Sequence, residues 1–91
     1  MRTIERTGAF KRDYKREQAG RHRRLDERLT AIVRLLAEDQ PLPAANRDHP
    51  LGGEWKGFRD CHIAPDLVLI YQKADDALRL VRLRSHSELF D

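Results

Sequence analysis

The chain has 91 residues, of which 40% are hydrophobic and 36% are charged, with a formal net charge of +3. This length supplies one hydrophobic core, and the moderate net charge excludes an intrinsically disordered chain. The lone cysteine, Cys61, excludes an intramolecular disulfide. The first residues have no apolar run typical of a signal peptide, and the longest apolar run, Leu67–Tyr71, is too short to span a bilayer. We therefore expect a single cytoplasmic domain over residues 1–91 with no membrane partner.

The first half of the chain predicts a short strand around residues 2–6 and then two helices. Thr7 is a suitable N-cap for the first helix, Phe10 and Tyr14 share one face of it, and Gly20 is placed to end it. The second helix has a single apolar stripe with helical spacing, formed by Leu25, Leu29, Ile32, Val33 and Leu36. Prolines at positions 41 and 43 then end this helix and begin an extended loop.

The second half predicts an antiparallel meander, because turn residues separate three strand-like segments. These segments cover residues 55–63, weakened at Gly57, then 67–71 and 77–84. The last residues contain the S-x-x-E spacing of a capping box, from Ser85 to Glu88, which predicts a short helical turn through Phe90. The expected fold class is α+β, with two N-terminal helices packed on one face of a small antiparallel sheet.

Positive charge is concentrated at the start of the chain. Residues 1–34 contain 11 Lys and Arg against 5 Asp and Glu, whereas residues 35–91 contain 7 against 10. A basic segment of this kind suits a polyanionic partner such as RNA or DNA. It also suits arginines that only solvate the outer faces of helices, so charge alone leaves both interpretations open.

Candidate catalytic residues lie close to the predicted turns of the sheet, where functional side chains concentrate. They are His49, His62, Asp66 and His86. A fourth histidine, His22, lies among arginines and is expected to be a solvated surface residue. Imidazole and carboxylate are ordinary zinc ligands, but the chain has no H-x₃-H, H-E-x-x-H or C-x-x-C spacing that would form a local chelate. We therefore expect neither a metal nor another cofactor.

The same residues suit metal-independent acid–base cleavage of RNA. The ribose 2′-hydroxyl must lose a proton as it attacks phosphorus, the 5′-oxygen must gain one, and histidine suits both transfers. An aspartate such as Asp66 can orient a histidine ring. A cation must offset the charge that develops on the phosphoryl oxygens, and Lys56, Arg59 and Arg84 are candidates for RNA binding and phosphate stabilisation.

Three motifs resemble those of the YafQ family within the RelE/ParE toxin superfamily. They are D-H-P-L-x-G-x-W from Asp48, R-D-x-H-x-x-P-D from Arg59 and S-H-x-x-L-F from Ser85, and a looser similarity covers residues 10–16. The resemblance implies a RelE-like fold and a type II toxin that cleaves messenger RNA codons in the ribosomal A site. It also implies a cognate antitoxin of the RelB/DinJ kind, with which the toxin represses their promoter, so that operator DNA is bound only through the antitoxin complex.

In this family the catalytic positions match His49, His62, Asp66, His86 and Phe90. The resemblance favours His86 for proton transfer at the scissile phosphate, with His49 and His62 as its acid or base partner and as phosphate ligands. Asp66 would orient a histidine or act as base. Phe90 suits stacking on a nucleotide base and equally suits a core anchor for the terminal helix.

One position departs from the family pattern. A Thr-Gly pair usually precedes the terminal Ser-His, whereas this chain has Leu83-Arg84. We expect Arg84 to contact an RNA phosphate, which would compensate for or alter the loop that glycine allows.

Three other functions fit parts of the sequence. A ParE-like toxin acts on DNA gyrase but does not need the histidines. A degenerate relative would serve only as antitoxin partner or corepressor, and the change to Leu83-Arg84 keeps that alternative open. A general ribonuclease would act on free RNA, but docking on ribosomal RNA makes better use of the basic first third.

Overall fold

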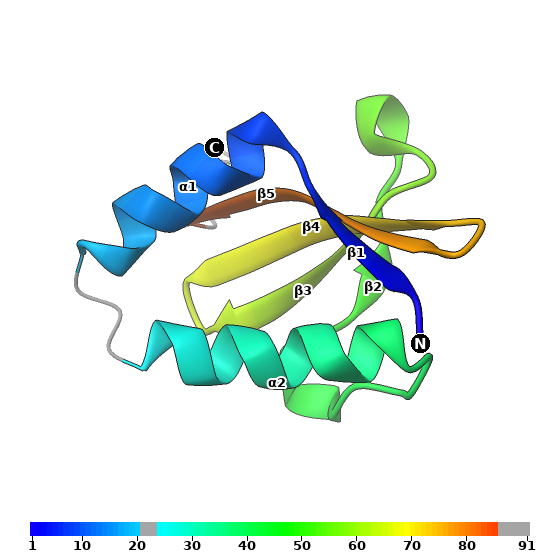
Figure 1. Cartoon of the computed structure of the whole chain (residues 1–91), viewed down its shortest axis with the longest axis horizontal. Coiled ribbons are helices and arrows are strands. Elements are labelled where there is room, and N and C mark those ends of the chain that lie inside the picture. The colour runs from blue at the N-terminus through cyan, green and yellow to red at the C-terminus, as the bar shows by residue number, and fades with distance from the viewer. Residues whose placement is uncertain (21–23, 86–91) are drawn as a thin grey trace.

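The computed structural model describes residues 1–20 and 24–85, which form two helices on one face of a five-stranded sheet (Figure 1). The α+β prediction is confirmed. The helices are α1 (Gly8–Gln18) and α2 (Leu25–Ala37), with short 3-10 helices η1 (Ala44–Asn46) and η2 (Gly53–Trp55). The strands are β1 (Thr3–Arg6), β2 (His49–Pro50), β3 (Arg59–Ala64), β4 (Leu67–Ala74) and β5 (Ala77–Ser85). No helix among these described residues is long and apolar enough to cross a membrane.

The strands lie in the order β1-β5-β4-β3-β2. The central β3–β4–β5 meander is antiparallel, as the sequence predicts. The sheet is nevertheless mixed, because β1 pairs in parallel with β5, with Thr3 opposite Ala77. The two-residue strand β2, which the sequence analysis did not predict, pairs with the outer edge of β3. Both additions depend on partners elsewhere in the chain rather than on local sequence pattern.

Several predicted element boundaries are wrong. β3 begins at Arg59 instead of Trp55, because Gly53–Trp55 forms η2 and Gly57 then turns the chain with a φ of +94°. A φ of this sign favours glycine and interrupts an extended strand. β4 continues to Ala74, beyond the apolar run that predicted it. α1 ends at Gln18, where the backbone N–H of Ala19 caps it, two residues before Gly20.

The hydrophobic core lies between the helices and the sheet. Thr7 caps α1 as predicted, since its hydroxyl accepts a hydrogen bond of 3.0 Å from the Phe10 N–H. The whole predicted stripe of α2 is buried, together with Phe10 of α1. From the sheet, alternate residues of β3, β4 and β5 complete the cluster, namely Cys61, Ile63, Leu67, Leu69, Tyr71, Leu78, Leu80 and Leu83.

A buried carboxylate joins α1 to the free edge of β5. The ladder between β1 and β5 stops at Leu80, and beyond it Asp13 accepts a 3.0 Å hydrogen bond from the Leu83 N–H. Arg82 forms a 2.7 Å ion pair with the same carboxylate, and Arg16 donates both to it and to the Leu83 carbonyl. Burial opposes ionisation of Asp13, but these donors outweigh it and lower its pKa. Asp13 therefore holds the last part of β5, which leads to the terminal motif.

Candidate active site

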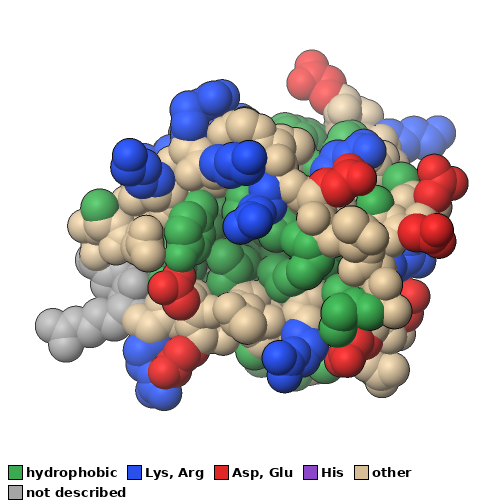
Figure 2. Space-filling view, in the orientation of Figure 1, with side chains coloured by type: hydrophobic (Ala, Val, Ile, Leu, Met, Phe, Trp, Pro, Cys, Tyr) green, Lys and Arg blue, Asp and Glu red, His purple; other side chains and the backbone are tan. Residues whose placement is uncertain are grey.

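The side of the sheet that faces away from the helices contains the candidate site. Successive residues of a strand point to opposite faces. Since Cys61 and Ile63 belong to the core under the helices, Asp60 and His62 point to the other side. Figure 2 looks onto the helix face and shows no histidine among the described side chains. His62 and Asp60 therefore lie on the opposite surface of the sheet, and His49 lies beside Asp60 there.

His49 is held opposite Asp60 by the pairing of β2 with β3. The His49 Nδ1 atom lies 2.7 Å from the Arg47 carbonyl oxygen and 3.1 Å from Asp60 Oδ1. The Asp60 residue is only 2% exposed, whereas about half of the His49 side chain is exposed. The Arg47 carbonyl and the buried Asp60 carboxylate beside Nδ1 orient the ring, which leaves Nε2 for substrate.

The loop that carries His49 is anchored by hydrogen bonds among Asp48, Arg59 and Tyr71. The buried Tyr71 hydroxyl donates to the Asp48 carboxylate. The Arg59 Nε atom lies 3.4 Å from the same Asp48 oxygen and 3.3 Å from the Tyr71 hydroxyl. Burial and the bond to Asp48 raise the pKa of Tyr71, so its phenol stays a donor at neutral pH. Arg59, which the sequence predicts to bind phosphate, therefore contacts Asp48 and Tyr71 in this structure.

His62 and Asp66 lie at the end of the sheet where β3 turns into β4. The His62 Nδ1 atom is 3.3 Å from the Pro65 carbonyl oxygen, and the Asn46 side chain donates a 2.7 Å hydrogen bond to the His62 carbonyl. Pro65 and Asp66 form the turn itself, as predicted. This end of the sheet thus contains one histidine and one carboxylate, both half-buried.

Arg84 shares the face of His62. Val68, which is fully buried, pairs with His62 on one side and with Arg84 on the other. Since neighbouring strands lie about 4.8 Å apart, the backbones of His62 and Arg84 are separated by about 10 Å. The other predicted cation, Lys56, is exposed after η2.

The terminal motif follows directly from β5. Ser85, the last residue of that strand, pairs with Leu67 and therefore lies beside the turn that contains Asp66. His86, Phe90 and the predicted helical turn lie outside the described residues, as does His22.

Asp60 is the site residue that the sequence analysis missed. An aspartate inside a predicted strand reads as a solvent-facing residue, and only the pairing with β2 shows that it is buried beside His49. The one available signal was its place within the R-D-x-H motif. Among the described residues, no group of three histidine, cysteine or acidic side chains is placed to hold a metal ion.

Comparison with known proteins decides the family. The sequence model of a family described as a bacterial toxin of type II toxin-antitoxin system, YafQ, matches residues 2–91. The chain belongs to the YafQ family. The mRNA interferase toxin YafQ of Escherichia coli strain K12 is 42% identical to it over 90 residues, which are 99% of this chain and 97% of that protein.

Solved YafQ structures share the fold over the whole chain. The crystal structure of YafQ from Escherichia coli strain BL21(DE3) is 41% identical, covers both chains completely and has a TM-score of 0.87. The YafQ chain similar to this one in the Escherichia coli DinJ-YafQ complex is 42% identical, also with complete coverage, and has a TM-score of 0.86. These matches place the two-helix, five-stranded arrangement among the YafQ toxins.

Proposed function

We propose that this chain is an mRNA interferase that cleaves codons in the ribosomal A site and is neutralised by a cognate antitoxin of the RelB/DinJ kind. The observation that carries the proposal is the placement of His49, Asp60 and His62 on one surface of the sheet, away from the helices. The name of the Escherichia coli relative and its complex with DinJ support both parts. Operator DNA would be bound only by the complex with the antitoxin.

The proposed chemistry is acid–base catalysis with attack by the 2′-hydroxyl. A base takes the 2′-hydroxyl proton while the oxygen bonds to phosphorus, the bond from phosphorus to the 5′-oxygen breaks, and an acid protonates that oxygen. The products are a 2′,3′-cyclic phosphate and a 5′-hydroxyl. We assign proton transfer to His86 and to one of His49 and His62, with the other binding the phosphate.

The remaining residues assist these transfers. Asp60 orients His49, and Asp66 orients a histidine or acts as base at the end of the sheet. We assign to Arg84 and Lys56 the task of offsetting negative charge on the phosphoryl oxygens. Arg59 lies on the same side of β3 as Cys61 and is bound to Asp48 and Tyr71, so we assign it to holding the loop of His49. Phe90 would stack on a base of the codon. The exposed cations of α1 and α2 supply an electrostatic surface for ribosomal RNA.

Primer extension tests this proposal. A defined messenger RNA is incubated with the purified protein, with and without programmed ribosomes, and wild type is compared with His86→Ala. We expect cuts in phase with the reading frame, only with ribosomes and only in the wild type. Equal cleavage of free RNA would contradict ribosome dependence, and the absence of any cleavage together with gyrase inhibition would support a ParE-like toxin instead.

A further inference from the structure

A tyrosine of the hydrophobic core reaches the loop that carries His49. Tyr71 is 1% exposed and belongs to the core cluster under the helices. Its hydroxyl donates a hydrogen bond to the carboxylate of Asp48, the residue just before His49. Phenylalanine would fill the same space in the core, so packing alone does not account for the hydroxyl.

Arg59 completes this contact from the neighbouring strand. It pairs with Tyr71 in β4 and with Pro50 in β2. The Arg59 Nε atom lies 3.4 Å from Asp48 Oδ1 and 3.3 Å from the Tyr71 hydroxyl oxygen. The Asp48 carboxylate is therefore held by a phenol and a guanidinium that both belong to the central strands of the sheet.

The loop needs this support, because its own backbone holds it weakly. β2 has only two residues, and so short a ladder contributes little stability. Arg47 adopts a φ of +49°, a conformation that costs a non-glycine residue energy and persists only where the surrounding structure imposes it. Asp48 lies between Arg47 and His49, so the contact from the core acts at the point where the loop is least stable.

The contact with Asp48 also determines which way His49 points. Successive residues of an extended chain point to opposite sides of a sheet. Since Tyr71 holds Asp48 on the helix side, His49 points to the other side, where Asp60 Oδ1 lies 3.1 Å from its Nδ1 atom. The Arg47 carbonyl oxygen, 2.7 Å from the same nitrogen, can only accept a hydrogen bond, so Nδ1 carries a hydrogen. Nε2 is then the atom of His49 that exchanges a proton with RNA.

The same loop is attached to the second histidine of the site. The Asn46 side chain donates a 2.7 Å hydrogen bond to the His62 carbonyl oxygen. Asn46 and Asp48 are two residues apart, so the loop is bound to His62 at one point and to Tyr71 at the next. These two attachments fix where the loop places His49 relative to His62.

From this arrangement we propose that Asp48 is a positioning residue for His49, held in place by Tyr71 and Arg59. Asp48 acts through the backbone of the loop and makes no contact with RNA. The proposal rests on the proposed function for the reaction that His49 serves. A proton transfer requires close alignment of donor and acceptor, and a displacement of about 1 Å can lower the rate by about a hundredfold.

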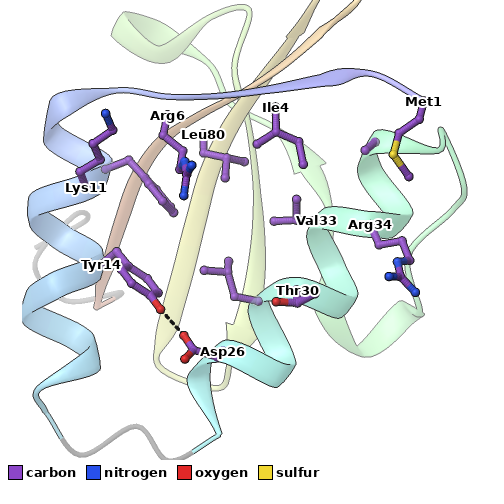
Figure 3. Close-up of a pocket in the computed structure, with 13 residues that line it drawn as sticks. Met1, Ile4, Arg6, Lys11, Tyr14, Asp26, Thr30, Val33, Arg34 and Leu80 are labelled. Carbon is purple, nitrogen blue, oxygen red and sulfur yellow. Dashed lines mark hydrogen bonds between the residues drawn. The ribbon is translucent and has the colours of Figure 1, made fainter.

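Two substitutions that each remove a tyrosine–aspartate hydrogen bond provide the first test. Tyr71→Phe releases Asp48, and Tyr14→Phe, the matched control, releases Asp26 between α1 and α2 (Figure 3). Both variants keep the aromatic ring, so both should fold. For codon cleavage on programmed ribosomes, we expect kcat to fall about tenfold in Tyr71→Phe with KM unchanged. Both constants should stay at the wild-type value in Tyr14→Phe.

Arg59→Gln tests the second contact of Asp48. Its control is Arg79→Gln, because Arg79 Nε lies 3.2 Å from a Glu5 carboxylate oxygen and the two arginine side chains are 42% and 43% exposed. We expect a lower kcat for Arg59→Gln alone. Its effect should not add to that of Tyr71→Phe in the double variant, since both act on the same carboxylate.

A phosphate ligand at Arg59 would behave differently. Its loss would raise KM and reduce the salt dependence of RNA binding. Its effect would also add to that of Tyr71→Phe, because the two side chains would act on separate groups. That combination would contradict the role proposed for Arg59.

Substitutions of Asp48 itself test whether its hydrogen-bonding oxygen matters. Asp48→Asn keeps an acceptor for the Tyr71 hydroxyl, whereas Asp48→Ala removes it. We expect the asparagine variant to retain most of the wild-type kcat and the alanine variant to lose about as much as Tyr71→Phe. Equal losses in the two Asp48 variants would contradict a role that depends on this hydrogen bond.

Nuclear magnetic resonance of the histidine rings gives a readout that does not need cleavage. In alkaline buffer, where the His49 ring is neutral, its Nδ1 atom should carry the hydrogen in the wild type. The ring nitrogen resonances of His49 should shift or broaden in Tyr71→Phe and in Asp48→Ala. They should keep their wild-type positions in Tyr14→Phe.

His62 serves as an internal reference in the same spectra. Its Nδ1 atom lies 3.3 Å from the Pro65 carbonyl oxygen, in a turn that Tyr71 does not hold. The His62 ring resonances should therefore stay close to their wild-type positions in Tyr71→Phe. Equal changes at His49 and His62 would contradict the proposal, since Tyr71 would then support the whole site rather than the loop of His49.

Wild-type kcat and wild-type His49 resonances in both Tyr71→Phe and Asp48→Ala would overturn the proposal. A wild-type protein that does not cleave RNA would instead overturn the proposed function. The His49 resonances would still show in that case whether Asp48 holds the ring, so the two failures can be distinguished.

Discussion

The two sides of the sheet differ in what the same strands present. On the helix side, Leu69 and Leu83 form a cross-strand pair that is fully buried under α1 and α2. One residue earlier on β4, Val68 has His62 and Arg84 as its partners, and both remain half-buried. The comparison shows how a small domain separates its tasks: one face supplies the hydrophobic core, and the other presents ionisable groups.

The largest expected effect is on the polar side. His62→Ala should lower the rate of ribosome-dependent cleavage by about 10²- to 10⁴-fold, because it removes a proposed acid, base or phosphate ligand. The free energy of unfolding should change little, since the side chain lies outside the core. Primer extension and denaturant unfolding measure the two quantities, and a large loss of stability with unchanged cleavage would reverse the roles we assign to the two faces.

A truncation on the helix side should lower stability and leave cleavage unchanged. Leu69→Ala removes a fully buried side chain and should destabilise the fold by about 2–5 kcal/mol, through lost burial and the cavity left behind. Cleavage per folded molecule should stay close to wild type. A variant that unfolds normally but has lost activity would show that the two faces are not separable in this way.

A smaller effect is expected where α1 meets β5. Asp13→Asn keeps the size of the buried side chain but removes its charge from Arg82 and Arg16. We expect a loss of about 2 kcal/mol in the free energy of unfolding, reduced from that of a fully buried pair because both arginines are partly exposed. Double-mutant analysis with Arg82→Gln checks the coupling, and strictly additive effects would contradict it.

The smallest expected effect is the loss of folding stability at low pH. Hydrogen bonds from Lys73 and Arg2 lower the pKa of Asp39 to about 2, and the pKa of Asp13 is also lowered. A carboxyl whose pKa is depressed by folding stabilises the protein above its ordinary pKa, and that stabilisation is lost as pH falls through the folded value. Stability should therefore decline between about pH 4 and 2.

Asp39→Asn isolates the exposed part of this response. Urea unfolding at a series of pH values should give a shallower acid dependence for the variant, and added salt should reduce the difference because the Asp39 carboxylate is exposed. Parallel curves for variant and wild type would show that this ion-pair cluster does not contribute.

The local elements could be predicted where the sequence carries a complete pattern. The stripe of α2 follows the helical period, and the Pro65-Asp66 turn separates two apolar segments, so both were placed correctly. The start of β3 was missed because Gly57 was treated as a weak strand residue, whereas its positive φ ends a 3-10 turn.

The site was harder to predict because its key contact is long-range. The motifs selected His49, His62 and Asp66, but the burial of Asp60 depends on β2 pairing with β3 across an intervening turn. Likewise Asp13 resembles a solvated helix residue until β5, about 70 positions later in the chain, meets it. Neither contact produces a periodic pattern from which it could be predicted in the sequence.

The most direct test of the central claim uses a modified messenger RNA on programmed ribosomes. A single 2′-deoxynucleotide replaces the nucleotide on the 5′ side of the cut that the wild-type protein makes, and products are read by primer extension. The account predicts that the cut at this position disappears while cuts at unmodified codons persist, because the 2′-hydroxyl is the attacking group. Undiminished cleavage at the deoxynucleotide would contradict the acid–base chemistry assigned to this face of the sheet.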